Sequence, residues 1–180
     1  MEIRGMFGRL PWGWMMLVAA LVLAGCNAQG TGPSDPRVLT PGNARATEDA
    51  VRAFMQSVAH DITHDGPTAW LKYFETSPTF FMAVNGQLAF ANNAAAAAGT
   101  QAFASANKSI ELTWGDDVRV DALTLELALV GASWREIQVD TAGNRAEESG
   151  YFTALVENRG GHWLIRDAHW SSPIAPAAAH

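Results

Sequence analysis

Two ionisable side chains near the end of the chain have the spacing of a catalytic pair. Asp167 and His169 are separated by one residue, in a segment with the alternating pattern of a β-strand. Residues two apart in a strand point to the same face, and by this count Trp163 and Ile165 share it. A carboxylate beside an imidazole could act as a general acid or base. The alternative is that His169 is a half-buried strand residue and Asp167 lies at the wet rim.

A second pair, His60 and His64, has the four-residue spacing with which two side chains of a helix can bind one metal ion. Both fall opposite the apolar stripe of their segment, which is centred on Val51, so we expect them to face solvent. Asp65 is better explained as the cap of a second helix. The sequence has no phosphate-binding glycine loop, nucleophile elbow or cluster of metal ligands. We therefore expect no metal and no cofactor.

Bulky aromatic and apolar residues recur along the chain and could line an apolar cavity. The same residues could equally form a plain core, which is the more common role of such residues. The candidates for the cavity wall are Trp70, Tyr73, Phe80, Met82, Trp114, Tyr151 and Trp163.

The only cysteine of the chain, Cys26, follows a segment with the three parts of a secretory signal. Arg4 and Arg9 supply positive charge, and the apolar run that follows is too short to span a bilayer comfortably. The run ends in Leu23-Ala24-Gly25-Cys26, which resembles the lipobox of bacterial lipoproteins. The resemblance implies that the Cys26 thiol receives a lipid and that the chain is cut before it. The alternative is a plain signal peptide with an incidental cysteine.

A lipidated Cys26 predicts a location at the cell envelope, with the membrane reached through the lipid anchor. Two or more acyl chains anchor a protein stably, whereas one is marginal. Asn27 follows in place of the aspartate that resembles an inner-membrane retention signal. This favours the outer membrane, facing the periplasm, if the host is Gram-negative. With its one cysteine lipidated, the chain has no disulfide, and its stability must come from its core.

The charge balance argues against nucleic acid as a partner. The 180 residues include 12 Lys and Arg against 18 Asp and Glu, a formal net charge of −6, and nucleic acid would need a basic face. The length suits one domain besides the signal. The predicted divisions are a lipoprotein signal peptide at 1–25, the lipidated cysteine and a flexible tether at 26–42, the domain at 43–172 and a disordered tail at 173–180.

Hydrophobic periodicity changes along the chain from that of helices to that of strands. Asn85-Gly86, between two short strand-like runs, is a strong hairpin signal. Helices followed by strands predict an α+β domain with its helices against one face of an antiparallel sheet. The predicted helices cover 44–63, 65–74 and 92–106, and the predicted strands cover 79–84, 87–91, 110–114, 123–129, 150–157 and 162–171.

This order resembles the nuclear-transport-factor-2-like superfamily, in its SnoaL-like branch, over residues 44–172. Three segments carry the resemblance: 65–74, the hairpin at Asn85-Gly86 with the helix after it, and 150–171, which ends in His169-Trp170-Ser171. The resemblance implies a cone-shaped curved antiparallel sheet, cystatin-like, wrapped around the N-terminal helices, with a pocket open at one end. Members include isomerases, polyketide cyclases, dehydratases, ligand binders and interaction domains, so the fold leaves function open.

The ketosteroid isomerases of this superfamily carry a carboxylate base on the first hairpin and a protonated acid on a later strand. The corresponding places fall near Met82 and near Gly150, and neither has a carboxyl group. We therefore expect non-catalytic binding of a small apolar ligand or of an envelope protein. The alternative is an isomerase, cyclase or dehydratase that uses Asp167 and His169.

The segment 122–130 predicts a strand with apolar residues on both faces. A sheet with one solvated face should alternate apolar and polar residues, so the second face should be covered by a partner, most simply in a homodimer. Many members of the superfamily also pair through the outer face of the sheet. Leu123, Leu125, Leu127 and Leu129 form one face of this segment, and Ala122, Ala128 and Val130 form the other.

Overall fold

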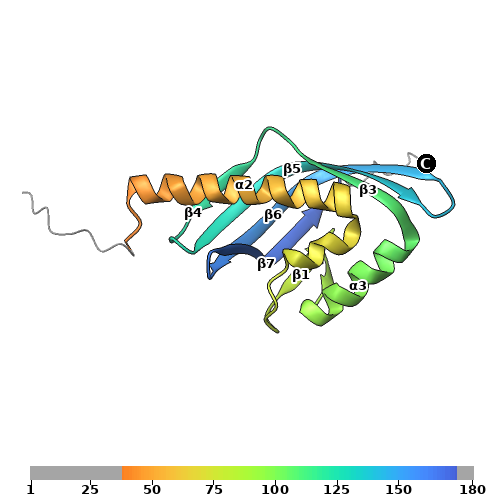
Figure 1. Ribbon diagram of the computed structural model, residues 1–180, viewed down its shortest axis with the longest axis horizontal. Helices are drawn as coiled ribbons and strands as arrows, with labels where there is room; N and C mark the ends of the chain where they lie inside the picture. Colours follow the sequence, from red (N-terminus) through yellow and green to blue (C-terminus); the bar gives the residue numbers. More distant parts are fainter. Residues whose placement is uncertain (1–37, 174–180) are drawn as a thin grey trace, which may run out of the picture. The chain divides into compact units, whose positions relative to one another are not determined.

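Residues 38–173 are described by the structure, which is a computed structural model (Figure 1). The predicted signal segment and Cys26 lie outside these residues. Arg37–His180 form one compact unit, and the described part of it carries a hydrophobic core of its own. A unit with its own core can be produced without the segment that precedes it. In the described part of the chain, no helix combines the length and the apolar character needed to cross a membrane.

The first helix, α2 (Pro41–Asp65), begins at a capping box. The Thr40 hydroxyl accepts a hydrogen bond from the Asn43 backbone N–H (3.4 Å), and the Asn43 side chain accepts one from the Thr40 N–H (2.6 Å). Pro41 then occupies the first helical position, where its missing N–H costs nothing. These residues start the helix three positions earlier than expected. It ends at Asp65 and is followed by the cap residue Gly66, whose φ of 85° suits glycine.

A short 3₁₀ helix, η1 (Pro67–Lys72), follows directly. The prediction that Asp65 caps this helix is wrong, because η1 has no side-chain cap. The Asp65 carboxylate is instead 2.7 Å from Nζ of Lys72. It ties the end of η1 back to the end of α2.

The predicted hairpin and third helix are both present. The strands β1 (Phe81–Val84) and β2 (Gln87–Phe90) are joined by Asn85 and Gly86, with φ of 48° and 80°. Two positive φ values are those of the two-residue turn that matches the twist of a hairpin. Helix α3 (Asn93–Ala106) begins after Asn92, whose side chain accepts a hydrogen bond from the Ala95 N–H (2.9 Å).

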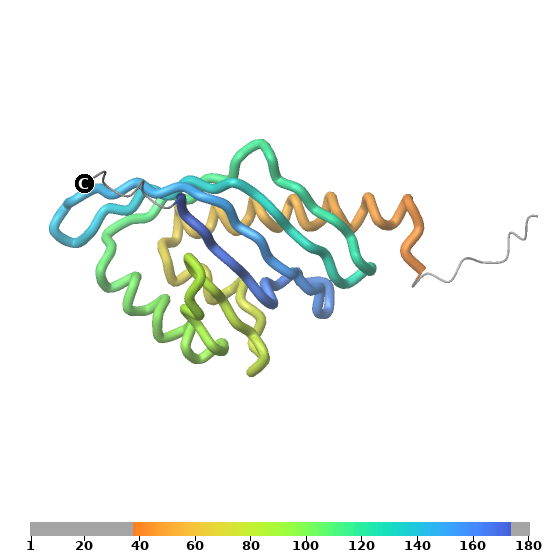
Figure 2. Tube along the Cα trace, turned by 180° about the vertical axis from the view of Figure 1, so that it is seen from behind, coloured from red at the N-terminus to blue at the C-terminus, as the bar shows by residue number. Residues whose placement is uncertain are grey.

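Five further strands complete one curved, unclosed sheet in the order β2-β1-β7-β6-β5-β3, with β4 also paired to β5. All neighbouring pairs are antiparallel except β1 and β7. Helix α2 crosses one face of the sheet, here called the inner face, and Figure 2 shows the opposite, outer face. This arrangement confirms the predicted α+β fold. The five strands are β3 (Asn107–Trp114), β4 (Arg119–Ala122), β5 (Leu127–Asp140), β6 (Arg145–Arg159) and β7 (His162–Ser171).

The core lies between α2 and the inner face. The apolar stripe of α2 is buried there, as the periodicity predicts. Trp114 of β3 fixes the helix to the sheet, because its Nε1 donates to the carbonyl of Met55 (2.7 Å). The largest fully buried apolar side chains are Phe80, Phe152, Met55, Ile62, Ile165, Val51, Val58, Val130 and Val156.

Only two of the four leucines that were predicted to share one strand lie in a strand. Leu127 and Leu129 belong to β5, but Leu123 and Leu125 lie in the turn between β4 and β5, where the Leu123 N–H donates to the Leu127 carbonyl (2.9 Å). The Thr124 hydroxyl closes this turn by accepting from the Leu127 N–H (3.0 Å). A threonine that bonds to nearby backbone competes with strand formation.

Strand β7 contains a β-bulge at Arg166. Leu155 of β6 is aligned with Asp167, but the next residue, Val156, is aligned with Ile165. β7 therefore has one extra residue here, and the alternation of its side chains shifts. Ile165 and Ala168 are consequently both buried although they are three residues apart.

Candidate functional site

A cavity of about 350 Å³ lies between the inner face, the β1–β2 hairpin, η1 and α3. Ligand pockets have volumes of about 300–1,000 Å³, so this one suits a small molecule. Its lining is formed by Trp70, Phe74, Met82, Val84, Asn85, Phe90, Gly99, Thr100, Phe103, Trp134, Glu136, Gln138, Glu148, Trp170 and Ser172.

The wall of the cavity is apolar where it is deepest and polar where it is exposed. Trp70, Phe74, Met82 and Trp134 are buried, whereas Asn85 and Glu148 are exposed and mark the rim. Gly99 lets Phe90 pack closely against α3, since a Cβ at this position would lie 2.3 Å from the Phe90 ring. An apolar interior with a few polar groups is the usual construction of a small-molecule site.

Trp170, near the end of β7, is the centre of the aromatic wall. Its ring meets the edge of Trp70 at a centroid distance of 5.6 Å and that of Trp134 at 5.0 Å. The interplanar angles are 90° and 76°, so the Trp170 ring stands nearly perpendicular to each of the other two indole rings. Edge-to-face contacts of this kind are favourable and hold the rings in fixed positions.

Glu136 of β5 is the most deeply placed carboxyl group of the cavity. It accepts a hydrogen bond from Nε2 of Gln138, two residues further along the same face. Burial raises the pKa of the Glu136 carboxyl above its ordinary value, against the effect of the Gln138 hydrogen bond. The charge of Glu148, directly opposite on β6, adds to the rise. A carboxyl group with a raised pKa inside a cavity is a candidate functional group.

Only two of the seven predicted wall residues, Trp70 and Met82, line this cavity. Phe80 is a fully buried core residue. Trp114 and Tyr151 line a separate groove at the end of the sheet, where Tyr151 is exposed because it points to the outer face.

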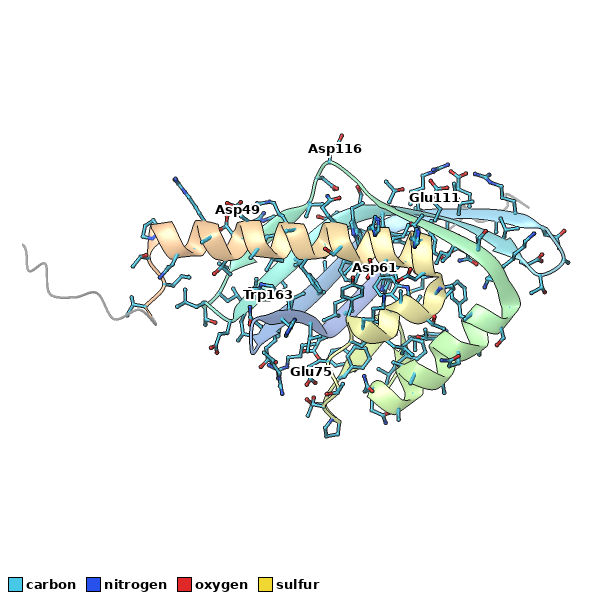
Figure 3. All side chains as sticks on the ribbon, in the orientation of Figure 1. Asp49, Asp61, Glu75, Glu111, Asp116 and Trp163 are labelled. Carbon is cyan, nitrogen blue, oxygen red and sulfur yellow. The ribbon has the colours of Figure 1, made fainter. Side chains whose placement is uncertain are left out.

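Tyr73 and Trp163 line another groove, beside α2. Trp163 and Asp61 of α2 are labelled in Figure 3. Tyr73 donates its hydroxyl to Asp61 of α2 (2.8 Å), and burial together with this carboxylate raises the pKa of Tyr73 to about 12. Lys72 lies 3.3 Å from the same carboxylate. The protonated hydroxyl of Tyr73 is thus bonded to the Asp61–Lys72 ion pair. This contact holds the end of η1 against α2, so the hydroxyl is already used within the fold.

The predicted pair, Asp167 and His169, lies outside the cavity. The expectation that both share a face with Ile165 is wrong, because the bulge at Arg166 turns them to the outer face. They line a shallow groove there, and His169 is exposed. The residues on the inner face at the end of β7 are instead Ala168 and Trp170.

The two histidines of α2 are exposed, as expected. Each ring hydrogen-bonds the aspartate that follows it, His60 to Asp61 (3.2 Å) and His64 to Asp65 (2.9 Å). In the described residues, no group of three or more His, Cys, Asp or Glu side chains is placed to hold a metal ion.

Four lining residues were not predicted from the sequence: Trp134, Glu136, Glu148 and Trp170. Two of them could have been found from the sequence. Every second residue of a strand faces the same side, and counting on from Ala128 and Val130 along β5 gives Trp134 and Glu136. The positions of Glu148 and Trp170 depend on strand pairing and on the bulge of β7, which periodicity does not show.

No protein-family model matches the sequence, and no curated protein matches it. Solved structures do match. A nuclear transport factor 2 superfamily protein from Salmonella enterica aligns with a TM-score of 0.59 and 13% identity, over 78% of this chain and 97% of its own. The domain has the nuclear-transport-factor-2-like fold. This confirms the expected fold.

Other structures with the nuclear-transport-factor-2-like fold differ in function. A candidate scytalone dehydratase from Novosphingobium aromaticivorans aligns with a TM-score of 0.65 and 11% identity, over 75% of this chain and 89% of its own. A hexachlorocyclohexane dehydrochlorinase aligns with a TM-score of 0.60 and 10% identity, over 78% of this chain and 96% of its own. At these identities the likeness shows the fold alone.

Proposed function

We propose that this protein is an envelope lipoprotein whose domain binds a small, mainly apolar molecule in the cavity between α3 and the inner face of the sheet. The observation that carries the proposal is the cavity itself, which has a buried aromatic wall and a polar rim. Within the described residues, the predicted Asp–His pair has no part in it, so binding is favoured over catalysis by that pair. The lipoprotein part of the proposal is supported by the signal-like N-terminal segment that ends in Leu23-Ala24-Gly25-Cys26.

Filling part of the cavity should weaken binding. Val84 lies on β1 with its side chain in the cavity wall, so Val84→Phe adds a ring to the space that a ligand would use. N-phenyl-1-naphthylamine, a neutral fluorescent probe, should bind the Arg37–His180 unit, and Val84→Phe should lower its affinity at least about tenfold, a change of about 1.4 kcal/mol.

Thr141→Phe is the matched control, because it adds the same ring at an exposed turn between β5 and β6. This variant should bind the probe like the unaltered unit. Equal binding by all three proteins would place the probe elsewhere and remove the support for the cavity as the site.

The outer face of the sheet supports the proposal of a homodimer. Leu129, Leu155, Asp167 and Phe81 are aligned across four neighbouring strands. Leu129 and Phe81 are 45% and 43% exposed, so the row presents apolar surface to solvent. A second copy that covered this row would bury it in both protomers at once.

The expected result is that the Arg37–His180 unit sediments as a dimer at micromolar concentration and that Leu129→Glu makes it a monomer. Leu123→Glu is the control, because Leu123 is 53% exposed but lies in the turn before β5. It should leave the dimer intact. A unit that is monomeric without any substitution would refute the dimer.

A further inference from the structure

The cavity presents three indole rings to whatever it contains. Trp70, Trp134 and Trp170 all line it, and Trp170 stands nearly perpendicular to the other two. The face of an aromatic ring is electron-rich and attracts a cation, and tryptophan does so most strongly. Cages of several aromatic rings are the construction with which proteins bind quaternary ammonium groups.

Two carboxyl groups stand opposite each other at one side of these rings. Glu136 follows Trp134 by two residues on the same face, and Glu148 is its direct partner across the β5–β6 pair. Like charges directly opposite in a sheet are destabilising. Neither glutamate has an ion pair with any residue in 38–173, and the residues that line the cavity include no Lys, Arg or His.

The outer face of the same two strands is different. There Arg135 and Glu147 form an ion pair, with 2.7 Å between Nε and Oε1. Among residues 38–173, an arginine thus pairs with the carboxylate on the outer face, whereas no cation pairs with Glu136 or with Glu148 at the rim of the cavity. An uncompensated carboxylate in a partly buried site is costly unless something pairs with it.

The indole N–H of Trp134 is a second, independent observation that points to a ligand at this wall. The side chain is 6% exposed, and its Nε1 is buried without a hydrogen-bond partner among the described residues. Trp114, by contrast, bonds its Nε1 to the Met55 carbonyl. Orphaned buried donors are rare in native proteins and call for a specific cause.

We propose that the ligand of this cavity is an organic ammonium ion, with its charge between Glu136 and Glu148 and its apolar groups against the three indole rings. The proposal rests on the proposed function, since it names the class of ligand for the same cavity. An anionic ligand would meet two carboxyl groups and no positive charge. A neutral ligand would leave the partly buried Glu136 carboxylate without an opposite charge. A bare metal ion would find few oxygen ligands among the aromatic rings.

Three small ligands of similar shape separate these cases. Benzyltrimethylammonium is a cation, neopentylbenzene is its neutral isostere, and phenylmethanesulfonate is an anion. Each is titrated by displacement of N-phenyl-1-naphthylamine from the Arg37–His180 unit at low salt. We expect the cation to bind at least about tenfold more tightly than the neutral isostere, and the anion to bind least.

Glu136→Gln keeps the shape of the side chain and removes its charge. It should lower the affinity for benzyltrimethylammonium about tenfold and leave the affinity for N-phenyl-1-naphthylamine nearly unchanged. Glu147→Gln is the matched control on the next strand, because this side chain lies on the outer face, where it pairs with Arg135. It should bind all the ligands like the unaltered unit.

The pH dependence has a definite sign. Because the charged form of Glu136 attracts the cation, affinity for benzyltrimethylammonium should rise from acidic to neutral pH, with Glu148 contributing as the facing carboxyl group. The rise should be smaller in Glu136→Gln, and neopentylbenzene should show none. Neopentylbenzene binding as tightly as the cation, or a cation affinity unchanged in Glu136→Gln, would overturn the proposal while leaving the cavity as a binding site. Failure of every probe to bind would overturn the proposed function itself.

Discussion

Replacing Cys26 by serine should leave the protein without lipid. The thiol is the nucleophile that the lipobox resemblance requires, and a serine hydroxyl does not replace it. Incorporation of a radiolabelled fatty acid should be lost, and the protein should move from the membrane fraction to the soluble fraction or remain as the unprocessed precursor. The change is all-or-none because Cys26 is the only cysteine of the chain.

Asn27→Ser is the control, since it alters the neighbouring residue and keeps the thiol. It should incorporate the label as before. The thermal stability of the domain should be the same in both variants, because the core is formed by residues of the Arg37–His180 unit. Continued labelling of the Cys26→Ser protein would contradict the lipoprotein assignment.

Replacing Gly150 by alanine should disrupt the end of β7. A Cβ at this position would lie 1.7 Å from the carbonyl oxygen of Ser171 and 2.8 Å from its carbonyl carbon. Both are backbone atoms, so the strand itself must shift. We expect Gly150→Ala to lower the free energy of unfolding by about 3 kcal/mol, as strong overpacking does.

The damage should extend to the cavity. Trp170 directly precedes the displaced Ser171, and Ser172, which follows it, lines the cavity and donates its N–H to the Asn85 side chain (2.7 Å). Loss of N-phenyl-1-naphthylamine binding should therefore accompany the loss of stability. Both are measured on one protein, by urea unfolding and by probe titration.

Gly42→Ala provides the control for a glycine without such contacts. The nearest atom to its added Cβ is Oγ1 of Thr40, at 4.0 Å, and the residue lies in the first turn of α2. Alanine favours helix over glycine by up to about 1 kcal/mol, so this variant should be as stable as the unaltered domain or slightly more stable. A Gly150→Ala domain with unchanged stability would show that β7 does not pass as closely as the structure has it.

The geometry at Gly150 bears on the acid that the resemblance to the superfamily would place near this residue. The backbone of Ser171 occupies the space that a side chain at Gly150 would need. The carboxyl groups of this cavity come instead from Glu136 and Glu148. The acidic groups at this cavity are therefore carried by β5 and β6 at positions other than Gly150.

The parts of the fold with a regular pattern could be predicted from the sequence. The apolar stripe of α2, the Asn85-Gly86 turn and the change from helices to strands each follow from local chemistry. They are sufficient for the order of elements and for helices packed against one face of the sheet.

The parts that were missed depend on pairing between distant segments. The ends of β5 and β6 carry polar residues on both faces, including Arg135, Glu136 and Glu147, so they show no alternation of apolar and polar residues. These residues form strands because β5 and β6 satisfy each other's backbone N–H and C=O groups. The extra residue at Arg166 likewise depends on the register of β6 and β7. Because of it, Asp167 and His169 lie on the outer face and not on the face that was predicted.

The most direct test of the cavity as a ligand site is a two-dimensional NMR titration of the tryptophan side chains of the Arg37–His180 unit with N-phenyl-1-naphthylamine. The unit contains Trp70, Trp114, Trp134, Trp163 and Trp170. The indole N–H signals of Trp70, Trp134 and Trp170, which line the cavity, should shift strongly and saturate together. Those of Trp114, bonded to Met55, and of Trp163, beside α2, should shift little. Equal shifts of all five signals, or larger shifts of Trp163 than of Trp134, would contradict binding in this cavity.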